Sequence, residues 1–345
     1  MDRKYYENKK VLIFGLGLLG GGLEAVKWFY KNGAILRITD LKKYNDLKTT
    51  IDKLEKFFKR YKNKKSKNIV KYILGKHRKE DIDWADIIYV NPGVSYKNEF
   101  VKYAITKNKE VVNDCYLFFK YAKGDIIAIT GTRGKTTTTT WIYELLKNLF
   151  DKKVLLGGNQ PDKSLFKIID KTNKNSISVL ELSSFQLEFY IKNGDFTQNY
   201  ADYTQNYAEL CRINAYSTQT YADNNITQNY ADLPSGNKGN NLKAPKIAII
   251  TCLLRDHLNR YENMEEYAKA KANIFMNQTK DGYLILNYDN EWTKFFLKLN
   301  PKSQVYFVSL KNLPKNIKGI FVKNNNLIIR DEKEIRIFDT QTYAD

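Results

Sequence analysis

The sequence has few of the residues that crosslink a chain or anchor it in a membrane. It contains three widely separated cysteines, Cys115, Cys211 and Cys252, and two histidines, His77 and His257. Neither a disulfide framework nor a cysteine–histidine zinc site is therefore predicted. There is no uncharged apolar run of about 18 residues and no apolar segment at the N-terminus, so we expect a cytoplasmic protein without a membrane partner.

Acidic residues are scarce relative to basic ones. Asp and Glu number 38 against 57 Lys and Arg, which gives a formal net charge of +19. Such an excess can indicate a nucleic-acid partner. The lysines are scattered among Asn, Ile and Tyr, however, so a composition bias explains the charge, and we predict no nucleic-acid partner. The densest run, 56–71, is expected to be a solvated helix face or loop.

The length of 345 residues, of which 43% are hydrophobic, allows two or three domains. We place the first domain at 1–123 and the second at 124–338. A low-complexity insertion is predicted at 194–243, where TQNYAD and close variants recur with little to bury. A further near copy lies at 339–345. Stacking of its tyrosines on single-stranded nucleic acid is disfavoured, because each copy carries an acidic residue.

A glycine-rich turn follows the first apolar strand, 11–14. Gly15, Gly17 and Gly20 have the spacing GxGxxG, and a second strand ends at Asp40. This is the dinucleotide-binding fingerprint of a Rossmann-like domain. Taken alone it favours an NAD-dependent dehydrogenase, although the same turn can hold the diphosphate of a nucleotide sugar. This second strand is predicted at 35–39, and further strands are predicted at 87–90 and 110–112.

A second phosphate-binding motif, TGTRGKTT, follows another apolar strand. Gly131 and Gly134 allow backbone N–H groups to face phosphate oxygens, Lys135 supplies a charge, and the Thr136 hydroxyl can bind Mg²⁺ at a helix N-terminus. Ile129 stands where the common motif has another glycine, so this is a shortened variant. The motif makes ATP the leading ligand.

The pattern after this motif predicts an α/β fold for the second domain. A helix is expected at 138–150, with Trp141, Leu145, Leu146 and Leu149 on its apolar face. Further strands are predicted from Asp125 and at 154–156, 178–182, 246–251 and 283–287. Helical patterns separate them, so we predict a P-loop-type, doubly wound, mostly parallel sheet behind the Rossmann-like N-terminal domain.

Polar residues follow two of these strands. Glu181 comes after an apolar run, at the place where a P-loop fold holds its magnesium ligand. Asp256 and His257 follow the strand at 246–251, and Lys271 lies on the next predicted helix. A lone histidine or lysine usually has an ordinary packing or surface role. Their position relative to the phosphate loop is what singles them out.

These motifs together resemble those of the Mur ligase family. The matching segments are GLGLLG at 15–20, NPGV at 91–94, TGTRGKTT at 130–137, GGN at 157–159, ELSSFQL at 181–187, DHLNRY at 256–261 and AKAKANIF at 268–275. ELSSFQL is the most discriminating, because family members that add other amino acids carry different residues after the glutamate. The resemblance covers nearly all of the chain outside the hexamers.

The resemblance implies an ATP-dependent amide ligase of peptidoglycan precursor synthesis, with ATP and two Mg²⁺ ions as cofactors. Its small-molecule partners would be UDP-N-acetylmuramoyl-L-alanine and D-glutamate, and it would act as a monomer. The substrate carboxylate would attack the γ-phosphate to give an acyl phosphate, and the amine of D-glutamate would then displace phosphate.

The resemblance also assigns residues to each site. The UDP substrate, in place of NAD, would contact Gly15, Gly17, Leu18, Leu19, Gly20, Asp40, Asn91, Gly93, Asn159 and Gln186. ATP would contact Gly131, Thr132, Gly134, Lys135, Thr136, Thr137, Asn287 and Asp289. The metal ligands would be Thr136, Glu181, His257 and Lys271, and the catalytic residues Lys135, His257 and Lys271. Lys271 would carry a carbamate, which replaces a cation by an oxygen ligand for magnesium.

Several residues depart from the family pattern, namely Arg133, Gln160, Pro161, Cys252, Leu254 and Arg255. An arginine beside metal ligands would repel Mg²⁺ unless its side chain points away. The sequence also ends where a third, D-glutamate-binding domain is expected, and we expect that the repeated hexamer element shortened it. The chain alone is then expected to ligate poorly or not at all, and a non-catalytic remnant that only binds nucleotide is an alternative.

Overall fold

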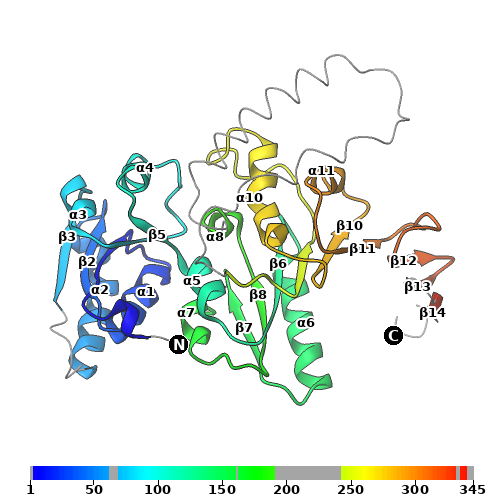
Figure 1. The fold of residues 1–345 in the computed structure, drawn as a ribbon, viewed down its shortest axis with the longest axis horizontal. Coiled ribbons are helices and arrows are strands. Elements are labelled where there is room, and N and C mark those ends of the chain that lie inside the picture. The colour runs from blue at the N-terminus through cyan, green and yellow to red at the C-terminus, as the bar shows by residue number, and fades with distance from the viewer. Residues whose placement is uncertain (1–2, 62–68, 161, 191–241, 332–334, 340–345) are drawn as a thin grey trace.

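The computed structural model describes residues 3–61, 69–160, 162–190, 242–331 and 335–339, and within them the chain forms two sheets (Figure 1). The hexamer copies lie outside the described residues. The first sheet uses the N-terminal third of the chain, and the second uses the remainder.

The first sheet has five parallel strands in the order β3-β2-β1-β4-β5. The strands are β1 (Lys10–Phe14), β2 (Ile35–Asp40), β3 (Val70–Leu74), β4 (Ile87–Val90) and β5 (Glu110–Val112). Four helices connect them: α1 (Gly21–Lys31), α2 (Tyr44–Arg60), α3 (Lys79–Trp84) and α4 (Glu99–Thr106). This doubly wound arrangement confirms the predicted Rossmann-like fold. Only β3 was missed, because this edge strand is half covered and its sequence, VKYIL, is not continuously apolar.

The second sheet has nine strands in the order β14-β13-β12-β11-β10-β9-β6-β8-β7. They are β6 (Asp125–Thr130), β7 (Val154–Gly158), β8 (Ile177–Glu181), β9 (Ile247–Ile250), β10 (Tyr283–Asn287), β11 (Gln304–Ser309), β12 (Gly319–Lys323), β13 (Asn326–Arg330) and β14 (Ile335–Asp339). All five predicted strands are present. The pairs from β7 to β12 are parallel, and β12 to β14 form an antiparallel extension that was not predicted.

The helices of this half are α5 (Asp114–Tyr121), α6 (Lys135–Leu149), α7 (Leu165–Ile169), α8 (Ser184–Leu187), α10 (Met264–Met276) and α11 (Thr293–Lys298). In Figure 1, α5 and α7 lie between the two sheets. One apolar core continues through this region, because the Phe166 ring of α7 lies 5.5 Å from Trp28 of α1 and 5.8 Å from Tyr89 of β4. The two sheets therefore share buried contacts.

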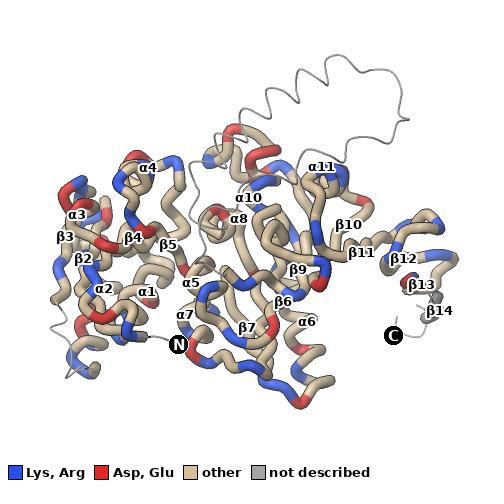
Figure 2. Tube along the Cα trace, viewed as in Figure 1, with Lys and Arg blue, Asp and Glu red and all other residues tan. Residues whose placement is uncertain are grey.

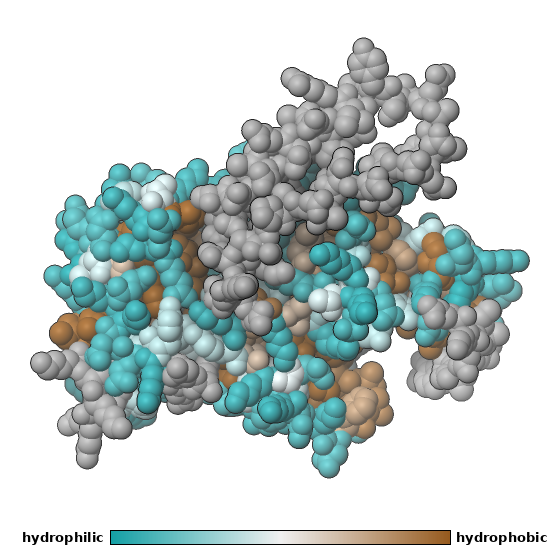
Figure 3. Space-filling model, in the orientation of Figure 1, coloured by the Kyte–Doolittle hydropathy of each residue, from teal (hydrophilic) through white to brown (hydrophobic). Residues whose placement is uncertain are grey.

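The apolar face predicted for the helix after the phosphate loop is correct at Leu146 and wrong at its other three residues. Trp141, Leu145 and Leu149 of α6 are exposed, Trp141 by 74%, and Figure 3 shows a hydrophobic patch over the lower end of this helix. The face that packs on the sheet carries Ile142 and Leu146. The sequence pattern favoured the helix face with more large apolar residues. The face that packs against the sheet is the one with fewer of them.

The surface charges are distributed over both halves. Lys and Arg occur along the whole described chain and alternate with Asp and Glu (Figure 2). None of the helices in the described ranges is both long enough and apolar enough to cross a lipid bilayer.

Candidate functional site

The predicted nucleotide and metal residues meet at one edge of the second sheet. β6 lies between β8 and β9, with β10 beyond β9 and β7 beyond β8, and all of these strands run parallel. Their carboxyl ends therefore share an edge. The strands β7 and β8 lie on one side of β6, and β9 and β10 lie on the other, so the strand order reverses at β6. This is where an open α/β sheet binds its ligand.

The phosphate loop begins where β6 ends. Gly131 has a φ of 148° and Gly134 a φ of 80°, conformations that favour glycine. Gly134 is also the residue from which α6 begins. A Cβ on Gly131 would lie 2.0 Å from Oγ1 of Thr251, whose hydroxyl donates to the carbonyl of Arg133 at 2.6 Å. Thr251, at the end of β9, thus holds the loop closed from the neighbouring strand.

Two lysines converge on this loop. Nζ of Lys135 donates to the carbonyl of Thr132 at 2.9 Å, and Nζ of Lys271 donates to the carbonyl of Gly131 at 2.8 Å. Lys271 is a buried residue of α10, and its ammonium group lies 4.6 Å from the ring centroid of Tyr267. Burial, helped by the charge of Lys135, lowers the pKa of Lys271 to about 7.

His257 lies beside the same groups. It has a left-handed backbone, with φ at 54°, and its N–H donates to the Asp256 carboxylate at 2.7 Å. Its ring is 4.9 Å from the ring of Phe185 and 5.7 Å from that of Tyr267. Partial burial lowers the pKa of His257, with smaller contributions from the charges of Lys271 and Lys135, while Asp256 raises it. The structure therefore brings Lys135, His257 and Lys271 together.

Glu181 ends β8 beside the phosphate loop and is 4% exposed. One of its carboxylate oxygens accepts a hydrogen bond from Nε2 of Gln160 at 3.1 Å. The carbonyl of Glu181 accepts from the N–H of Asn159 at 2.8 Å, and the side chain of Asn159 is exposed. A buried carboxylate at this edge is an oxygen ligand of the kind Mg²⁺ prefers.

Within the described ranges no cluster of three or more His, Cys, Asp or Glu side chains forms a ready-made metal cage. The Thr136 hydroxyl lies on the first turn of α6, where a nucleotide phosphate would be received, and both Thr136 and Thr137 are exposed. Glu181 and Thr136 are thus suitable oxygen donors.

The residues predicted to contact the nucleoside follow β10. Oδ1 of Asn287 accepts from the N–H of Asp289, and the two carboxylate oxygens of Asp289 accept from Ser309 and Leu310 at 2.9 and 2.8 Å. The Asp289 side chain therefore fastens β10 to the end of β11. Asn290, which the sequence did not single out, pairs with both backbone groups of Leu253 after β9.

The glycine turn of the first sheet lies at the carboxyl end of β1. Gly15, Gly17 and Gly20 all have positive φ, and Leu18 and Leu19 between them are exposed by 55% and 102%. Asn91 after β4 lies against this turn, 3.2 Å from where a Cβ on Gly15 would be, and its Oδ1 accepts from the N–H of Gly93.

The Asp40 carboxylate already has backbone partners. One oxygen accepts from the N–H of Gly17 and the other from the N–H of Lys42, each at 2.9 Å. The acidic residue of a dinucleotide site would instead present its oxygens to a ribose. Asp40 thus ties the glycine turn to the end of β2.

Gln186 is buried where the two halves meet. The side-chain Nε2 of Gln186 donates to the Asp114 carboxylate at 2.8 Å, and the backbone carbonyl of Gln186 accepts from Nδ2 of Asn113 at 2.8 Å. Its Oε1 accepts from the N–H of Ser183, which completes the capping box that starts α8. Burial raises the pKa of Asp114 to about 6, although the hydrogen bond from Gln186 opposes this. Asp114 was not recognised in the sequence, where no motif marks it.

The unusual residues near the phosphate loop have structural explanations. The side chains of Arg133 and Arg255 are exposed, so solvent screens their charges. Cys252 donates from its sulfur to the carbonyl of Arg133 at 3.6 Å and supports the loop beside Thr251. The predicted repulsion of magnesium by Arg255 is therefore weakened.

Two family models match the chain. The Mur ligase middle domain matches residues 129–201 and 232–342, and the N-terminal domain of MurD-like Mur ligases matches residues 9–113. The second match covers the GxGxxG turn, so the dehydrogenase alternative is not favoured. The segment between the two parts of the first match, 202–231, falls inside the hexamer-bearing region.

Curated relatives resemble nearly the whole chain. The UDP-N-acetylmuramoylalanine–D-glutamate ligase of Clostridioides difficile strain 630 is 31% identical over 98% of this chain and 60% of its own length. The ligase of the same name from Borreliella burgdorferi strain B31 is 31% identical over 96% of this chain and 59% of its own. The chain thus spans about 60% of the length of these relatives. A solved Neisseria meningitidis UDP-N-acetylmuramate:L-alanyl-γ-D-glutamyl-meso-diaminopimelate ligase is 12% identical over 95% of this chain and 86% of its own, with a TM-score of 0.48.

Proposed function

The chain belongs to the Mur ligase family, and from that premise we propose that it is an ATP-dependent ligase that joins D-glutamate to UDP-N-acetylmuramoyl-L-alanine in peptidoglycan precursor synthesis. The observation that carries the proposal is the convergence of Lys135, Glu181, His257 and Lys271 on the carboxyl edge of the second sheet. A phosphoryl-transfer site needs this combination of positive charge and metal-binding oxygen at one place.

The ATP phosphates would lie on the loop from Gly131 to Thr137. The backbone N–H groups at the start of α6 and the ammonium of Lys135 would receive them. In the structure Lys135 donates to the carbonyl of Thr132, a hydrogen bond that a phosphate oxygen can replace. The nucleoside would extend toward Asn287 and Asp289, at the end of β10.

Magnesium, when bound, would neutralise the developing charge on the transferred phosphoryl group. Glu181, Thr136 and His257 are the proposed protein ligands, with Lys271 as a carbamate completing the set. At pH near 7 about half of Lys271 would be neutral, because its pKa is about 7. A neutral amine can add to carbon dioxide and release a proton, which yields the carbamate, whereas an ammonium cannot.

The UDP substrate would be received by the first sheet. Its diphosphate would lie on the turn from Gly15 to Gly20, with Leu18 and Leu19 exposed to meet the ligand and Asn91 and Gly93 beside it. Asp40 would contact the uridine end. Asn159 of the second half would then face the peptide end of the substrate, and the buried Gln186 would support this side of the site through Asp114 and Ser183. The peptide end must reach the phosphate loop for its carboxylate to attack the γ-phosphate.

The chain's own residues would act mainly by positioning and by electrostatic stabilisation. Lys135 would stabilise the charge that develops on the γ-phosphoryl oxygens as the substrate carboxylate attacks. The resulting acyl phosphate would react with the amine of D-glutamate to form the amide and release phosphate. Burial around Glu181 and Lys271 strengthens each electrostatic interaction, because it lowers the local dielectric constant.

The proposal is tested by incubating the chain with ATP, Mg²⁺, UDP-N-acetylmuramoyl-L-alanine and D-glutamate, while phosphate release and product mass are followed. We expect slow phosphate release that depends on the UDP substrate, and a product heavier by one glutamate residue. Lys135→Ala should reduce phosphate release at least about 100-fold, the scale of losing one preorganised charge at a transition state. Binding of the UDP substrate and ATP without any turnover would favour the remnant alternative.

A further inference from the structure

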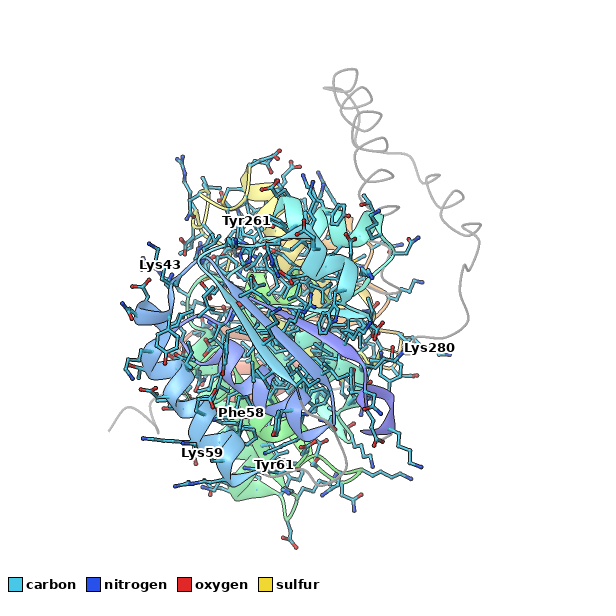
Figure 4. All side chains as sticks on the ribbon, turned by 90° about the vertical axis from the view of Figure 1, so that its left-hand side faces the viewer. Lys43, Phe58, Lys59, Tyr61, Tyr261 and Lys280 are labelled. Atoms are coloured by element: carbon cyan, nitrogen blue, oxygen red, sulfur yellow. The ribbon has the colours of Figure 1, made fainter. Side chains whose placement is uncertain are left out.

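Arg260 lies where the two halves of the molecule meet. It follows His257 by three residues, and its backbone N–H donates to the carbonyl of His257 at 2.9 Å. The side chain is 8% exposed. Its neighbour Tyr261 is labelled in Figure 4 and lies toward the same end of the molecule as Lys43, which follows β2. Phe58 and Tyr61 are labelled toward the opposite end. Arg260 thus belongs to the end at which the sheet edges carry the proposed ligand sites.

The guanidinium of Arg260 joins three segments. Its Nε and Nη2 donate to the two carboxylate oxygens of Glu188, just after α8, at 2.8 and 2.7 Å. Nη1 and Nη2 also donate to the carbonyls of Gly93 and Val94, in the loop after β4, at 3.2 and 3.0 Å. Glu188 is almost fully buried and also accepts from the hydroxyl of Tyr261 at 2.6 Å. A buried, bidentate pair of this kind has one geometry.

The same guanidinium is in contact with the ring next to His257. Its central carbon is 3.9 Å from the ring centroid of Phe185, and the Phe185 ring is 4.9 Å from the His257 ring. The histidine is therefore held in two ways, through its backbone carbonyl and through its ring. Both routes lead to Arg260, which in turn is fixed to the carbonyls of the first sheet's loop.

A second connection between these segments is weaker. Nζ of Lys97 donates to Glu262 at 2.7 Å and to Glu266 at 2.9 Å, and Tyr96 also donates to Glu266. Glu262 is 79% exposed and Glu266 14%, and Lys97 itself is 25% exposed and makes no bidentate pair, so this connection is more open to solvent than that of Arg260. Exposed ion pairs contribute little and are screened by salt. Arg260 is thus the connection with the geometry and the burial to transmit a displacement.

We propose that Arg260 is a positioning residue that couples the two substrate sites, so that the UDP substrate and the ATP nucleotide each bind more tightly when the other is present. The inference rests on the proposed function, because it takes the loop of Asn91 to Val94 as part of the UDP site and His257 as part of the ATP site. A substrate that orders the loop of Asn91 to Val94 fixes the carbonyls of Gly93 and Val94. The guanidinium is then fixed as well, and with it Phe185 and His257.

The test measures a coupling factor. The dissociation constant of UDP-N-acetylmuramoyl-L-alanine is determined by calorimetry with the full chain, with and without Mg²⁺ and a non-hydrolysable ATP analogue, and the reciprocal titration is also made. For the wild type we expect each ligand to tighten the other at least about fivefold, and by the same factor in both directions, as linkage requires.

Two variants remove the coupling in different ways. Arg260→Lys keeps the charge but cannot make the bidentate fork. The double variant Arg260→Met with Glu188→Gln removes both charges, and so avoids leaving one of them buried and unpaired. In both we expect the coupling factor to fall below about twofold, while the affinity for each ligand alone changes by less than about threefold.

Arg330→Lys is the matched control. Arg330 also donates to backbone carbonyls, those of Leu313 and Pro314, and lies over a phenylalanine ring, Phe321, at 4.6 Å, but it does so on β13 away from both sites. It should lower thermal stability and leave the coupling factor unchanged. A wild type that binds neither ligand would overturn the proposed function along with the inference. A wild type that binds both with strong coupling, retained in the two Arg260 variants, would overturn the inference alone.

Discussion

Lys271 shows how one residue can be both costly to stability and suited to chemistry. Burial takes its ammonium out of water, and the nearby charge of Lys135 adds repulsion, so its pKa falls from 10.5 to about 7. The unfolded chain keeps the higher pKa. Below pH 7 the proton is therefore held at an energetic cost to the folded state, and the cost disappears as the pH rises from about 7 to about 10.5.

We predict that Lys271→Met is more stable than the wild type near neutral pH, and that the difference shrinks as the pH is raised. Methionine keeps an unbranched apolar stem of similar length without the charge, and a shift of this size corresponds to a difference of about 5 kcal/mol between low and high pH. The measurement is urea unfolding in carbon dioxide-free buffer between pH about 6 and about 10. A difference in stability that does not vary with pH would contradict the burial of a titrating amine.

Asp114 is predicted to titrate in the opposite sense. Burial raises its pKa from 3.8 to about 6, so the folded state holds a proton that the unfolded state has released, and the stability falls as the pH rises through this window. Asp114→Asn keeps an oxygen to accept from Gln186 and removes the titration. Between pH about 3 and about 7, the free energy of unfolding of this variant should therefore rise by about 3 kcal/mol relative to that of the wild type. Parallel unfolding profiles for the two proteins would show that Asp114 does not titrate in this range.

At this scale the sequence predicted the residues of the motifs but not their environments. Lys135, Glu181 and His257 were recognisable because they follow apolar strands at the spacing a nucleotide site requires. Asp114, Thr251 and Glu188, which hold Gln186, the phosphate loop and Arg260, were not recognisable, since each acts on a segment distant in sequence and becomes relevant only when the strands are ordered in the sheet. Arg260 stood inside a recognised motif, but nothing local indicated that it reaches Gly93 and Val94.

At the scale of helices and strands, the apolar runs of the parallel strands were the reliable signal. Strands inside a parallel sheet are largely buried on both faces and therefore mostly apolar, and all those predicted from such runs are present. The edge strand β3 and the strands β11, β12 and β13 are partly exposed and have mixed sequences. The Asn324–Asn325 turn, with φ of 49° and 60°, was a hairpin signal that could have indicated β12 and β13.

The parallel pairing of β7 with β8 at Glu181 depends on a glycine. Gly158 has a φ of 121°, and a Cβ there would lie 1.9 Å from the carbonyl oxygen of Glu181. We predict that Gly158→Ala destabilises the fold by at least about 3 kcal/mol, from backbone strain and overpacking combined. Gly75→Ala is the control, because Gly75 has a φ of 81° but no atom within 3.7 Å of the added Cβ, so only the strain of about 1–2 kcal/mol applies. Urea unfolding measures both, and equal losses would show that the close approach at Glu181 is relaxed easily.

For the whole molecule, the two-sheet organisation followed from the two phosphate-binding motifs, each at the end of a strand. How the sheets meet did not follow, because the contact is made by α5, α7 and α8, which are short and carry no motif outside ELSSFQL. The apolar core is continuous across this contact. The proposed substrate sites on the two sheets would thereby be kept at a fixed separation, as transfer between two bound substrates requires.

We predict that the two sheets unfold in a single cooperative transition. Phe166 carries the contact between them: it is 6% exposed and touches the rings of Trp28 and Tyr89 from the first sheet. Phe166→Ala should cost about 3–5 kcal/mol, because it opens a cavity in the shared core. The exposed Phe150, changed to Ala, should cost less than about 0.5 kcal/mol.

Urea unfolding is followed by tryptophan fluorescence, to which Trp28 contributes, and by far-ultraviolet circular dichroism. Coincident curves in the wild type are expected, since a core that runs through both sheets cannot be exposed in one of them without loss in the other. Two separated transitions would mean that each sheet is stable alone and that the contact at Phe166 adds little.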